Sequence, residues 1–290
     1  MKEVVVLSGK GGTGKTSILG SFAALSEKKV LADCDVDAAD LHLLLNPSVR
    51  THQEFWSGQV ALIDEDKCTS CGLCEDLCRF DAIADFTVDP VACEGCGFCS
   101  RICPVSAITM QDELAGNYFV SDTRYGPLVH ARLGIAKENS GKLVAQVRKK
   151  ARELAEREGL EYILSDGPPG IGCPVISSIS GVNLALLVTE PTLSGIHDLK
   201  RVQGVLRHFG IPSAVCINKW NLNEENTLNI ERYCSEEGVR VVSKIPYDDV
   251  FTEAMVHGMP LVEYSNGPIS NEIAHMWSSL VNFLDQETNG

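Results

Sequence analysis

The sequence contains no apolar run that approaches the roughly eighteen residues needed to span a bilayer, so we expect no contact with a membrane. It also lacks the pattern of a signal peptide. Met1 and Lys2 lead directly into the apolar run Val4–Leu7, without the basic, apolar and small-residue order of such a peptide. These absences predict a protein that stays in the cytoplasm.

Basic residues are also scarce in this chain. There are 25 lysines and arginines against 39 aspartates and glutamates, which gives a formal net charge of −14. Nucleic-acid binding draws much of its affinity from basic side chains that neutralise phosphates, so this balance predicts no nucleic-acid partner. With 44% hydrophobic and 22% charged residues, the composition is globular, and 290 residues suffice for one large α/β unit with a small insert.

The order of apolar segments predicts an α/β protein with a doubly wound, mostly parallel sheet. The run Val4–Leu7 is followed by glycines, a helical stretch at Lys15–Ser26 and a second strand at Lys29–Ala32. The alternation returns from Ser140, where we expect helices at 140–158, 194–209 and 273–284 and strands at 162–165, 184–189, 214–217 and 240–245. In such sheets, ligands bind at the carboxyl ends of the strands.

The α/β alternation is interrupted in the first half of the chain. Between Leu45 and about Met110 the apolar periodicity fades, and cysteine, aspartate and glycine accumulate. We therefore predict a small α+β domain inserted into the larger domain. The predicted division is a larger domain at 1–55 and 115–290 and an insert at 56–114.

A phosphate-binding loop follows the first predicted strand. The residues from Gly9 to Thr16 match G-x-x-x-x-G-K-S/T between a strand and a helix, where backbone N–H groups and the helix dipole can surround phosphates. Lys15 is expected to hold the β- and γ-phosphates, and the Thr16 hydroxyl to bind Mg²⁺. The predicted nucleotide-binding residues of this loop are Gly9, Lys10, Gly11, Gly12, Thr13, Gly14, Lys15, Thr16 and Ser17.

The loop contains a second lysine, and Lys-Gly-Gly-Thr-Gly-Lys-Thr resembles the deviant Walker motif of the MinD/ParA group. The resemblance implies an ATPase in which Lys10 reaches across a dimer interface to the partner's nucleotide. It therefore implies a homodimer, or a heterodimer with a paralogous ATPase, that sandwiches ATP. The resemblance extends over residues 1–45 and 140–285, and the segment from Ile245 to Pro260 also fits it.

Three further motifs resemble the same group and occur in the same order. Asp33-Cys34-Asp35 resembles the first switch, in which Asp35 orients the attacking water and helps to hold the metal. Asp166, in the segment from Ile163 to Gly170, resembles the Walker B residue that binds Mg²⁺ through water. Asn218 and Lys219 resemble the base-recognition corner, with the Asn218 amide bonded to adenine. Taken alone, an aspartate at a strand end is more often a helix cap or turn former than a metal ligand, and the alternative for Asn218 is a turn-forming asparagine.

The spacing C-x2-C-x2-C-x3-C occurs twice, 25 residues apart, and each copy is followed by Ala-Ile. In a reducing cytoplasm, twelve cysteines favour metal ligation over disulfides. This spacing is typical of ferredoxins with two four-iron, four-sulfur (4Fe–4S) clusters, in which the fourth cysteine of each run binds the other cluster. The predicted ligands are Cys68, Cys71, Cys74 and Cys103 for the first cluster and Cys78, Cys93, Cys96 and Cys99 for the second.

The alternative for this repeat is tetrahedral zinc, which paired C-x2-C units also suit. Gly72 and Gly97 occupy matching positions and let backbone amides approach cluster sulfurs. Pro104 follows Cys103 as the ferredoxin pattern expects, but Arg79 replaces the corresponding proline. From 64 to 112 there are ten acidic and three basic residues, which favours a basic redox partner.

Four cysteines lie outside the repeat. Cys34, Cys216 and Cys234 fall in or beside predicted helices and strands, which favours buried structural thiols. Cys173 follows the second switch, where a thiol could sense the nucleotide or contact a metal centre. Cys234 has no cysteine nearby, so the cysteine pair with which Mrp-type iron–sulfur carriers share a cluster is absent.

Together these motifs resemble MinD-superfamily ATPases with an inserted ferredoxin domain, and more distantly Mrp-type carriers. The resemblance implies slow ATP hydrolysis, stimulated by a partner and carried out by Lys15, Thr16, Asp35 and Asp166, with Lys10 acting in trans. The nucleotide cycle would gate electron transfer or assist metallocluster assembly on a client protein. The alternatives are a spatial organiser that dimerises on DNA or membrane with its clusters as a redox sensor, and an amidation enzyme of the cobyrinate-diamide type.

Overall fold

The computed structural model describes residues 1–134 and 139–288. The chain divides into two compact units. Among the described residues, the larger unit comprises 1–52, 118–131 and 140–288, and the smaller unit comprises 53–117, 132–134 and 139. The smaller unit therefore includes residues beyond Leu133 in addition to a segment around the predicted insert at 56–114. No helix in the described part of the chain is both long enough and apolar enough to cross a membrane.

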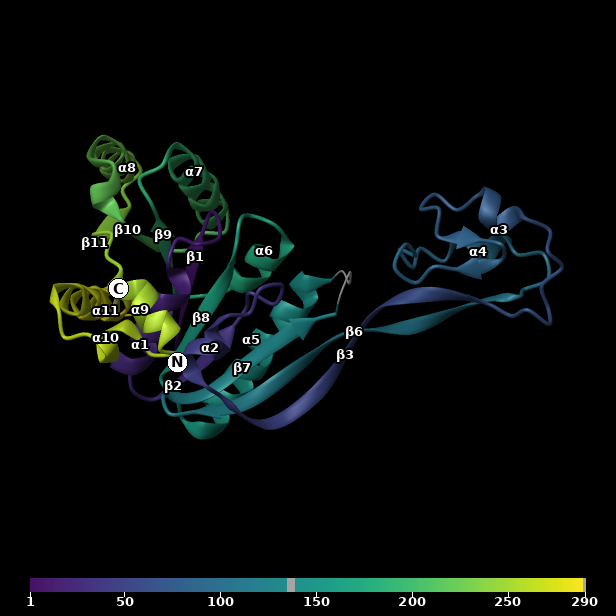
Figure 1. Cartoon of the computed structure of the whole chain (residues 1–290), viewed down its shortest axis with the longest axis horizontal. Coiled ribbons are helices and arrows are strands. Elements are labelled where there is room, and N and C mark those ends of the chain that lie inside the picture. The colour runs from purple at the N-terminus through teal and green to yellow at the C-terminus, as the bar shows by residue number, and fades with distance from the viewer. Residues whose placement is uncertain (135–138, 289–290) are drawn as a thin grey trace. The chain divides into compact units, whose positions relative to one another are not determined.

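The larger unit is built on a sheet whose strand order is β11-β10-β9-β1-β8-β2-β7-β6-β3 (Figure 1). Each neighbouring pair from β11 to β7 is parallel, which confirms the predicted doubly wound, mostly parallel α/β sheet. The strands are β1 (Lys2–Ser8), β2 (Lys29–Asp33), β3 (Ser48–Ile63), β6 (Ile108–Thr123), β7 (Gly126–Leu133), β8 (Tyr162–Pro169), β9 (Leu184–Thr189), β10 (Ser213–Asn218) and β11 (Arg240–Ile245).

One face of the sheet packs against α1 and the C-terminal helices. Val4 and Val6 of β1 are fully buried there, in a core that includes Phe22 of α1 and Trp277 of α11. The ring centroids of Phe22 and Trp277 lie 5.2 Å apart. The elements on this side are α1 (Lys15–Leu25), α2 (Leu41–Leu45), α9 (Val250–Val256), α10 (Leu261–Tyr264) and α11 (Pro268–Thr288).

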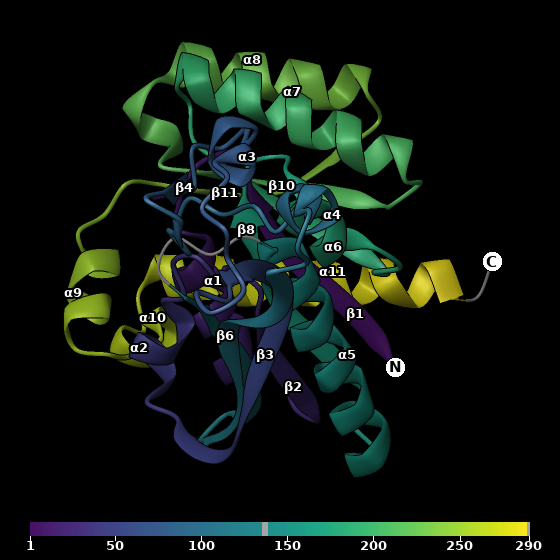
Figure 2. The same cartoon turned by 90° about the vertical axis from the view of Figure 1, so that its right-hand side faces the viewer.

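The opposite face packs against a second group of helices. Successive residues of a strand point to opposite faces, so Val5 and Leu7 join a different core, with Val175 of α6 and Leu199 of α7. This group contains α5 (Ser140–Glu158), α6 (Cys173–Ile179), α7 (Leu193–His208) and α8 (Glu224–Glu236), with the short helix η1 (Trp220–Leu222) before α8. Figure 2 shows α7 and α8 on one side of the strands and α11 on the other.

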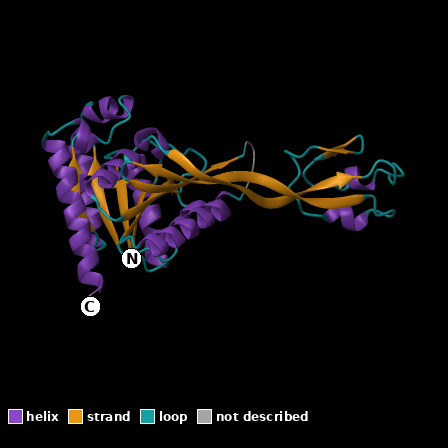
Figure 3. Ribbon diagram, turned by 90° about the horizontal axis from the view of Figure 1, so that it is seen from below, coloured by secondary structure: helices purple, strands orange, loops and turns teal. Residues whose placement is uncertain are grey.

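The smaller unit holds short elements between long loops (Figure 3). They are α3 (Leu73–Asp76), β4 (Ile83–Ala84), β5 (Thr87–Val88) and α4 (Phe98–Ile102). The sequence repeat appears here as a structural repeat: the Asp64 N–H donates to the Ala107 carbonyl, and the Asp89 N–H to the Ala82 carbonyl, both at 2.8 Å. Each half of the repeat is thereby bonded to the end of the other half.

Candidate functional site

The phosphate loop joins the carboxyl end of β1 to the first residue of α1. Gly12 and Gly14 adopt positive φ angles of 79° and 91°, which side chains other than glycine rarely tolerate. A Cβ atom on Gly14 would lie 2.6 Å from Nδ2 of Asn218, and one on Gly9 would lie 2.2 Å from Cβ of Asp198. Gly9 and Gly14 are therefore required by the packing of the loop, and Gly12 by its backbone conformation.

Lys15 lies at the centre of a group of carboxylates at the carboxyl ends of β2 and β8. Its Nζ is 3.0 Å from Oδ2 of Asp35 and 3.4 Å from Oδ1 of Asp166. Burial alone would lower the pKa of Lys15, but the charges of Asp166 and Asp35 outweigh burial and raise this pKa. Lys15 is thus a permanently charged group, as required to hold phosphate oxygens.

Thr16 and Asp166 form an oxygen-rich site beside Lys15. The Thr16 hydroxyl donates to Oδ2 of Asp166 at 2.6 Å, and Oδ1 of this buried carboxylate accepts no hydrogen bond among the described residues and faces the Lys15 ammonium at 3.4 Å. Burial removes solvent from the Asp166 carboxylate and raises its pKa. A cation bound beside this carboxylate would favour its ionised form. Hydroxyl and carboxylate oxygens are ligands that Mg²⁺ prefers, and these residues therefore fit that ion.

Asp33 is a residue of the site to which the sequence analysis gave no role. It ends β2 and pairs in register with Asp166 of β8. The Asp33 carboxylate is fully buried and accepts the N–H groups of Asp35 at 3.1 Å and Leu41 at 3.3 Å. Burial, and then the charge of Asp166, raise the pKa of Asp33 well above its usual value. The sequence signal that could have identified Asp33 is its position as the last residue of a buried strand.

Asn218 and Lys219 lie against the phosphate loop, at the end of β10. The Asn218 amide donates to the Thr13 carbonyl at 2.8 Å, and Nζ of Lys219 donates to the Gly12 carbonyl at 3.2 Å. The side chain of Asn218 therefore holds the loop in this structure, and its contact with adenine stays a prediction.

Glu190 is a second residue that the sequence analysis missed. Lys10, predicted to act in a partner subunit, forms an ion pair with Glu190 of its own chain and lies 3.3 Å from the Ser194 hydroxyl. Glu190 also binds Lys219 at 3.2 Å. Burial raises the pKa of Glu190, but hydrogen bonds from the two lysines outweigh it and lower this pKa overall. The sequence signal that could have identified Glu190 is an acidic residue directly after a buried strand, here β9, which pairs with β1.

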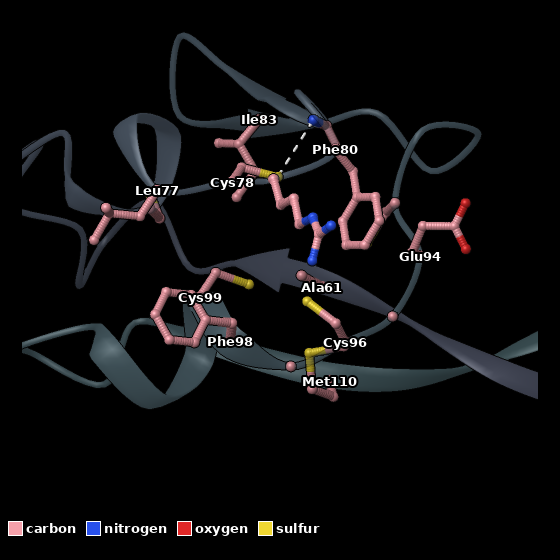
Figure 4. Close-up of a pocket in the computed structure, with 16 residues that line it drawn as sticks. Ala61, Leu77, Cys78, Phe80, Ile83, Glu94, Cys96, Phe98, Cys99 and Met110 are labelled. Atoms are coloured by element: carbon pink, nitrogen blue, oxygen red, sulfur yellow. Dashed lines mark hydrogen bonds between the residues drawn. The ribbon is translucent and has the colours of Figure 1, made fainter.

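The cysteines of the repeat line two cavities in the smaller unit. Those around the first, narrow cavity of about 20 Å³ are Cys68, Cys71, Cys74 and Cys103. Those around the second cavity, of about 350 Å³, are Cys78, Cys93, Cys96 and Cys99 (Figure 4), and Cys74 lines this cavity as well. Among the described residues, no three His, Cys, Asp or Glu side chains converge closely enough to hold one metal ion.

The donors around these cavities suit an iron–sulfur cluster. All eight thiols are free, and backbone N–H groups donate to the sulfurs of Cys68, Cys78 and Cys103 at 3.2–3.4 Å. Such hydrogen bonds are among the factors that tune cluster potentials. Gly72 and Gly97 precede α3 and α4 with positive φ angles of 80° and 69°, so the backbone turns tightly at the same point of both copies. The narrow first cavity requires its thiols to move outward around a cluster.

The other four cysteines differ in their exposure. Cys34, Cys216 and Cys234 are buried, which confirms the expectation from sequence, and burial raises the pKa of Cys216 to about 12 and of Cys234 to about 11. Cys173 is exposed at the start of α6. Its predicted role in nucleotide sensing stays a prediction.

Comparison with known proteins gives matches over most of the chain. The model of the CobQ/CobB/MinD/ParA nucleotide binding domain matches residues 4–261. An uncharacterised protein of Methanocaldococcus jannaschii is 32% identical over 285 residues, which is 97% of each chain. An iron–sulfur cluster carrier protein of Pyrococcus horikoshii is 24% identical over 158 residues, which is 50% of this chain and 54% of the carrier.

A solved structure shares the fold of the chain. The septum site-determining protein MinD of Pyrococcus horikoshii, complexed with Mg-ADP, superposes with a TM-score of 0.60 and 19% identity. The alignment covers 96% of this chain and 95% of that protein. At 19% identity, this similarity establishes a shared fold and no more.

Proposed function

This chain belongs to the CobQ/CobB/MinD/ParA family of nucleotide-binding proteins, and we propose that it is an ATPase whose nucleotide cycle controls electron transfer from two 4Fe–4S clusters. The observation that carries the proposal is the division of eight thiols between two cavities in a chain that also has a complete phosphate loop. The proposed insert is a ferredoxin-like domain, and the acceptor is a partner protein in the cytoplasm.

The proposed hydrolytic machinery is the group of side chains around Lys15. Lys15 binds the β- and γ-phosphates, and Asp35 orients the attacking water from its position 3.0 Å from Nζ of Lys15. Thr16 and Asp166 hold Mg²⁺, which neutralises phosphate charge when it is bound. Asn218 and Lys219 keep the loop in shape through their bonds to the carbonyls of Thr13 and Gly12.

The proposed working form is a dimer that sandwiches ATP. Lys10 contributes in trans, and for this it must exchange its ion pair with Glu190 for the phosphates of the partner's nucleotide. A triphosphate carries more negative charge than one carboxylate, so the exchange is favoured when nucleotide is bound. The second subunit is either the same chain or a paralogue. The mass of the ATP-bound complex distinguishes these two possibilities.

Assembly of a metallocluster on a client protein is the second candidate function. It is favoured by the similarity of half the chain to an iron–sulfur cluster carrier protein. In electron transfer the iron stays on this chain through many cycles, whereas in delivery the iron leaves with the client. Retention of iron after repeated ATP turnover with an apo-acceptor therefore distinguishes the two functions.

A spatial organiser is the alternative that the resemblance to MinD favours. The net charge of −14 opposes binding to DNA and to anionic lipid. Co-sedimentation with DNA and with anionic liposomes at low salt, with and without ATP, tests this function. ATP-dependent pelleting would replace the electron-transfer proposal with the organiser.

The proposed function is tested by purification of the whole chain without oxygen, followed by iron, sulfide and zinc counting and an ATPase assay. Two 4Fe–4S clusters predict about eight iron and eight sulfide per chain. The matched control is Lys15→Ala, because Lys15 lies in the larger unit and the cysteines lie in the smaller one. This variant should keep its iron and lose ATP hydrolysis. Bound zinc, or no iron, in a chain that hydrolyses ATP contradicts the proposal.

A further inference from the structure

The two copies of the cysteine repeat can be compared residue by residue. A shift of 25 residues maps the first copy onto the second, and it maps hydrogen bonds as well as residues. The Ala82 N–H donates to the sulfur of Cys78 at 3.4 Å, and the Ala107 N–H donates to the sulfur of Cys103 at 3.2 Å. The Ser70 N–H also donates to the sulfur of Cys68 at 3.4 Å, without a counterpart at Cys93 among the described residues, so the cavities differ in one backbone bond and otherwise in side chains.

Arg79 is the clearest break in the equivalence. It directly follows Cys78 and lines the second cavity, whereas its counterpart Pro104 directly follows Cys103 and lines the first. Arg79 forms no ion pair or hydrogen bond with another residue of the described chain. No carboxylate in direct contact therefore cancels its charge, and the guanidinium acts on whatever the second cavity holds.

The short helices that contain the third ligands differ in charge in the same direction. In α3, Glu75 and Asp76 follow Cys74, which lines both cavities, and an Asp76 carboxylate oxygen is 3.8 Å from a Cβ atom built on Gly72 of the wall of the first cavity. Their counterparts in α4 are Ser100 and Arg101, which follow Cys99 of the second cavity. The Asp76 carboxylate thus lies near the wall of the first cavity, whereas the corresponding position after Cys99 is basic.

Two acidic residues oppose this trend. Asp81 stands between Phe80 and Ala82 of the second cavity, and its counterpart between Val105 and Ala107 of the first is Ser106. Glu94 lines the second cavity, and its counterpart Thr69 lines the first. Figure 4 shows the carboxylate of Glu94 pointing away from Cys96 and Cys99. Among the lining residues, the first cavity has no Asp, Glu, Lys or Arg, and the second has Arg79 and Glu94.

We propose that Arg79 makes the two cavities electronically unequal, so that the cluster bound by Cys78, Cys93, Cys96 and Cys99 has the higher reduction potential. This inference rests on the proposed function, because it requires both clusters. Reduction adds one negative charge to a cluster, and a nearby positive charge stabilises that product. An electron that a one-electron donor places on the first cluster then passes to the second, which is reduced as the first is reoxidised.

The arrangement also assigns a direction to electron flow. The electron leaves from the second cavity, whose rim presents the exposed side chains of Phe80 and Phe98. Arg79 acts only through its positive charge and binds neither iron nor the acceptor. Its effect is therefore visible in the cluster potentials without any acceptor protein.

The test is a redox titration of the full-length, anaerobically prepared protein, followed by electron paramagnetic resonance. Arg79→Gln and Arg79→Pro are compared with wild type, and Arg79→Lys keeps the charge. Pro104→Arg is the matched variant at the first cavity, and Glu94→Gln tests the opposing carboxylate. Iron and sulfide are counted in every sample before titration, so the absence of clusters is recorded as failure of the proposed function.

Loss of the Arg79 charge should shift the electron distribution between the clusters about fivefold towards the first, which is roughly 40 mV at 59 mV per tenfold change. The step at higher potential should move down in Arg79→Gln and Arg79→Pro and stay in place in Arg79→Lys. Pro104→Arg should raise the lower step. Unchanged potentials in a fully loaded Arg79→Gln protein, or a shift of the lower step instead, overturn the inference.

Discussion

Lys10 of the phosphate loop forms an ion pair with Glu190, which directly follows β9. These residues are 180 positions apart, and they meet because β9 and β1 are neighbours in the sheet. The same carboxylate binds Lys219, which in turn bonds to the Gly12 carbonyl. Glu190 therefore connects the lysine proposed to act in trans with the corner that supports the loop.

We predict that Glu190→Gln lets the chain dimerise at a lower ATP concentration than wild type. The ion pair holds Lys10 in its own subunit, and its loss should lower the half-maximal ATP concentration about threefold to fivefold, as expected for a partly exposed pair. Sedimentation at varied ATP concentration measures this. Lys10→Ala should form no ATP-dependent dimer with or without the Glu190 change, and an unchanged ATP requirement in Glu190→Gln would contradict the holding role.

The buried carboxylate of Asp33 predicts a pH dependence of stability in the nucleotide-free protein. Its pKa is raised on folding, so between its unfolded pKa of about 4 and its folded pKa the native state binds more protons than the unfolded state. Stability from this group is therefore lost as the pH rises through that window. Denaturant unfolding with chelator at several pH values should give a flatter profile for Asp33→Asn than for wild type.

The loop glycines predict a contrast between two single substitutions. Gly14→Ala forces a positive φ of 91° on a side chain and drives its Cβ atom into Asn218, so we expect a loss of about 1–3 kcal/mol in the free energy of unfolding. Gly11→Ala meets no atom within 4 Å and should change stability by less than about 0.5 kcal/mol. Unfolding of the nucleotide-free forms measures both, and equal losses would contradict the packing argument.

Variants of Asp35 and Lys15 should distinguish ATP hydrolysis from nucleotide binding. Asp35→Ala removes the group proposed to orient water and should lower the turnover number about 100-fold or more while nucleotide still binds. Lys15→Ala should abolish both, because it removes the phosphate contact. Single-turnover hydrolysis and calorimetric binding measure the two effects, and normal turnover in Asp35→Ala would show that another group orients the water.

The sequence predicted those parts of the structure whose signals are local. The phosphate loop is one continuous motif, and the burial of all of Val4–Leu7 is visible as an apolar run. The spacing of the cysteines predicts an insert at 56–114, and its ferredoxin-like character stays a prediction. The residues of the loop and of the first strand lie within about twenty positions of one another, and the cysteine repeat extends from Cys68 to Cys103.

Features that depend on sheet order were not predicted from sequence. The strands β6 and β7 lie in a segment that the sequence analysis left without elements, and β7 pairs with β2, about one hundred positions earlier. Asp33 and Glu190 escaped notice for the same reason, since their partners Asp166 and Lys10 are distant in sequence. An acidic residue at a strand end acquires meaning only once its neighbouring strand is known.

If nucleotide bound at the phosphate loop alters the clusters, electron paramagnetic resonance of the reduced protein must differ with and without Mg-ATP. We expect the spectrum or potential of at least one cluster to change when Mg-ATP is added to wild type, and no change in Lys15→Ala with the same iron content. Identical spectra with and without Mg-ATP in a wild-type protein that binds ATP and holds both clusters would contradict it.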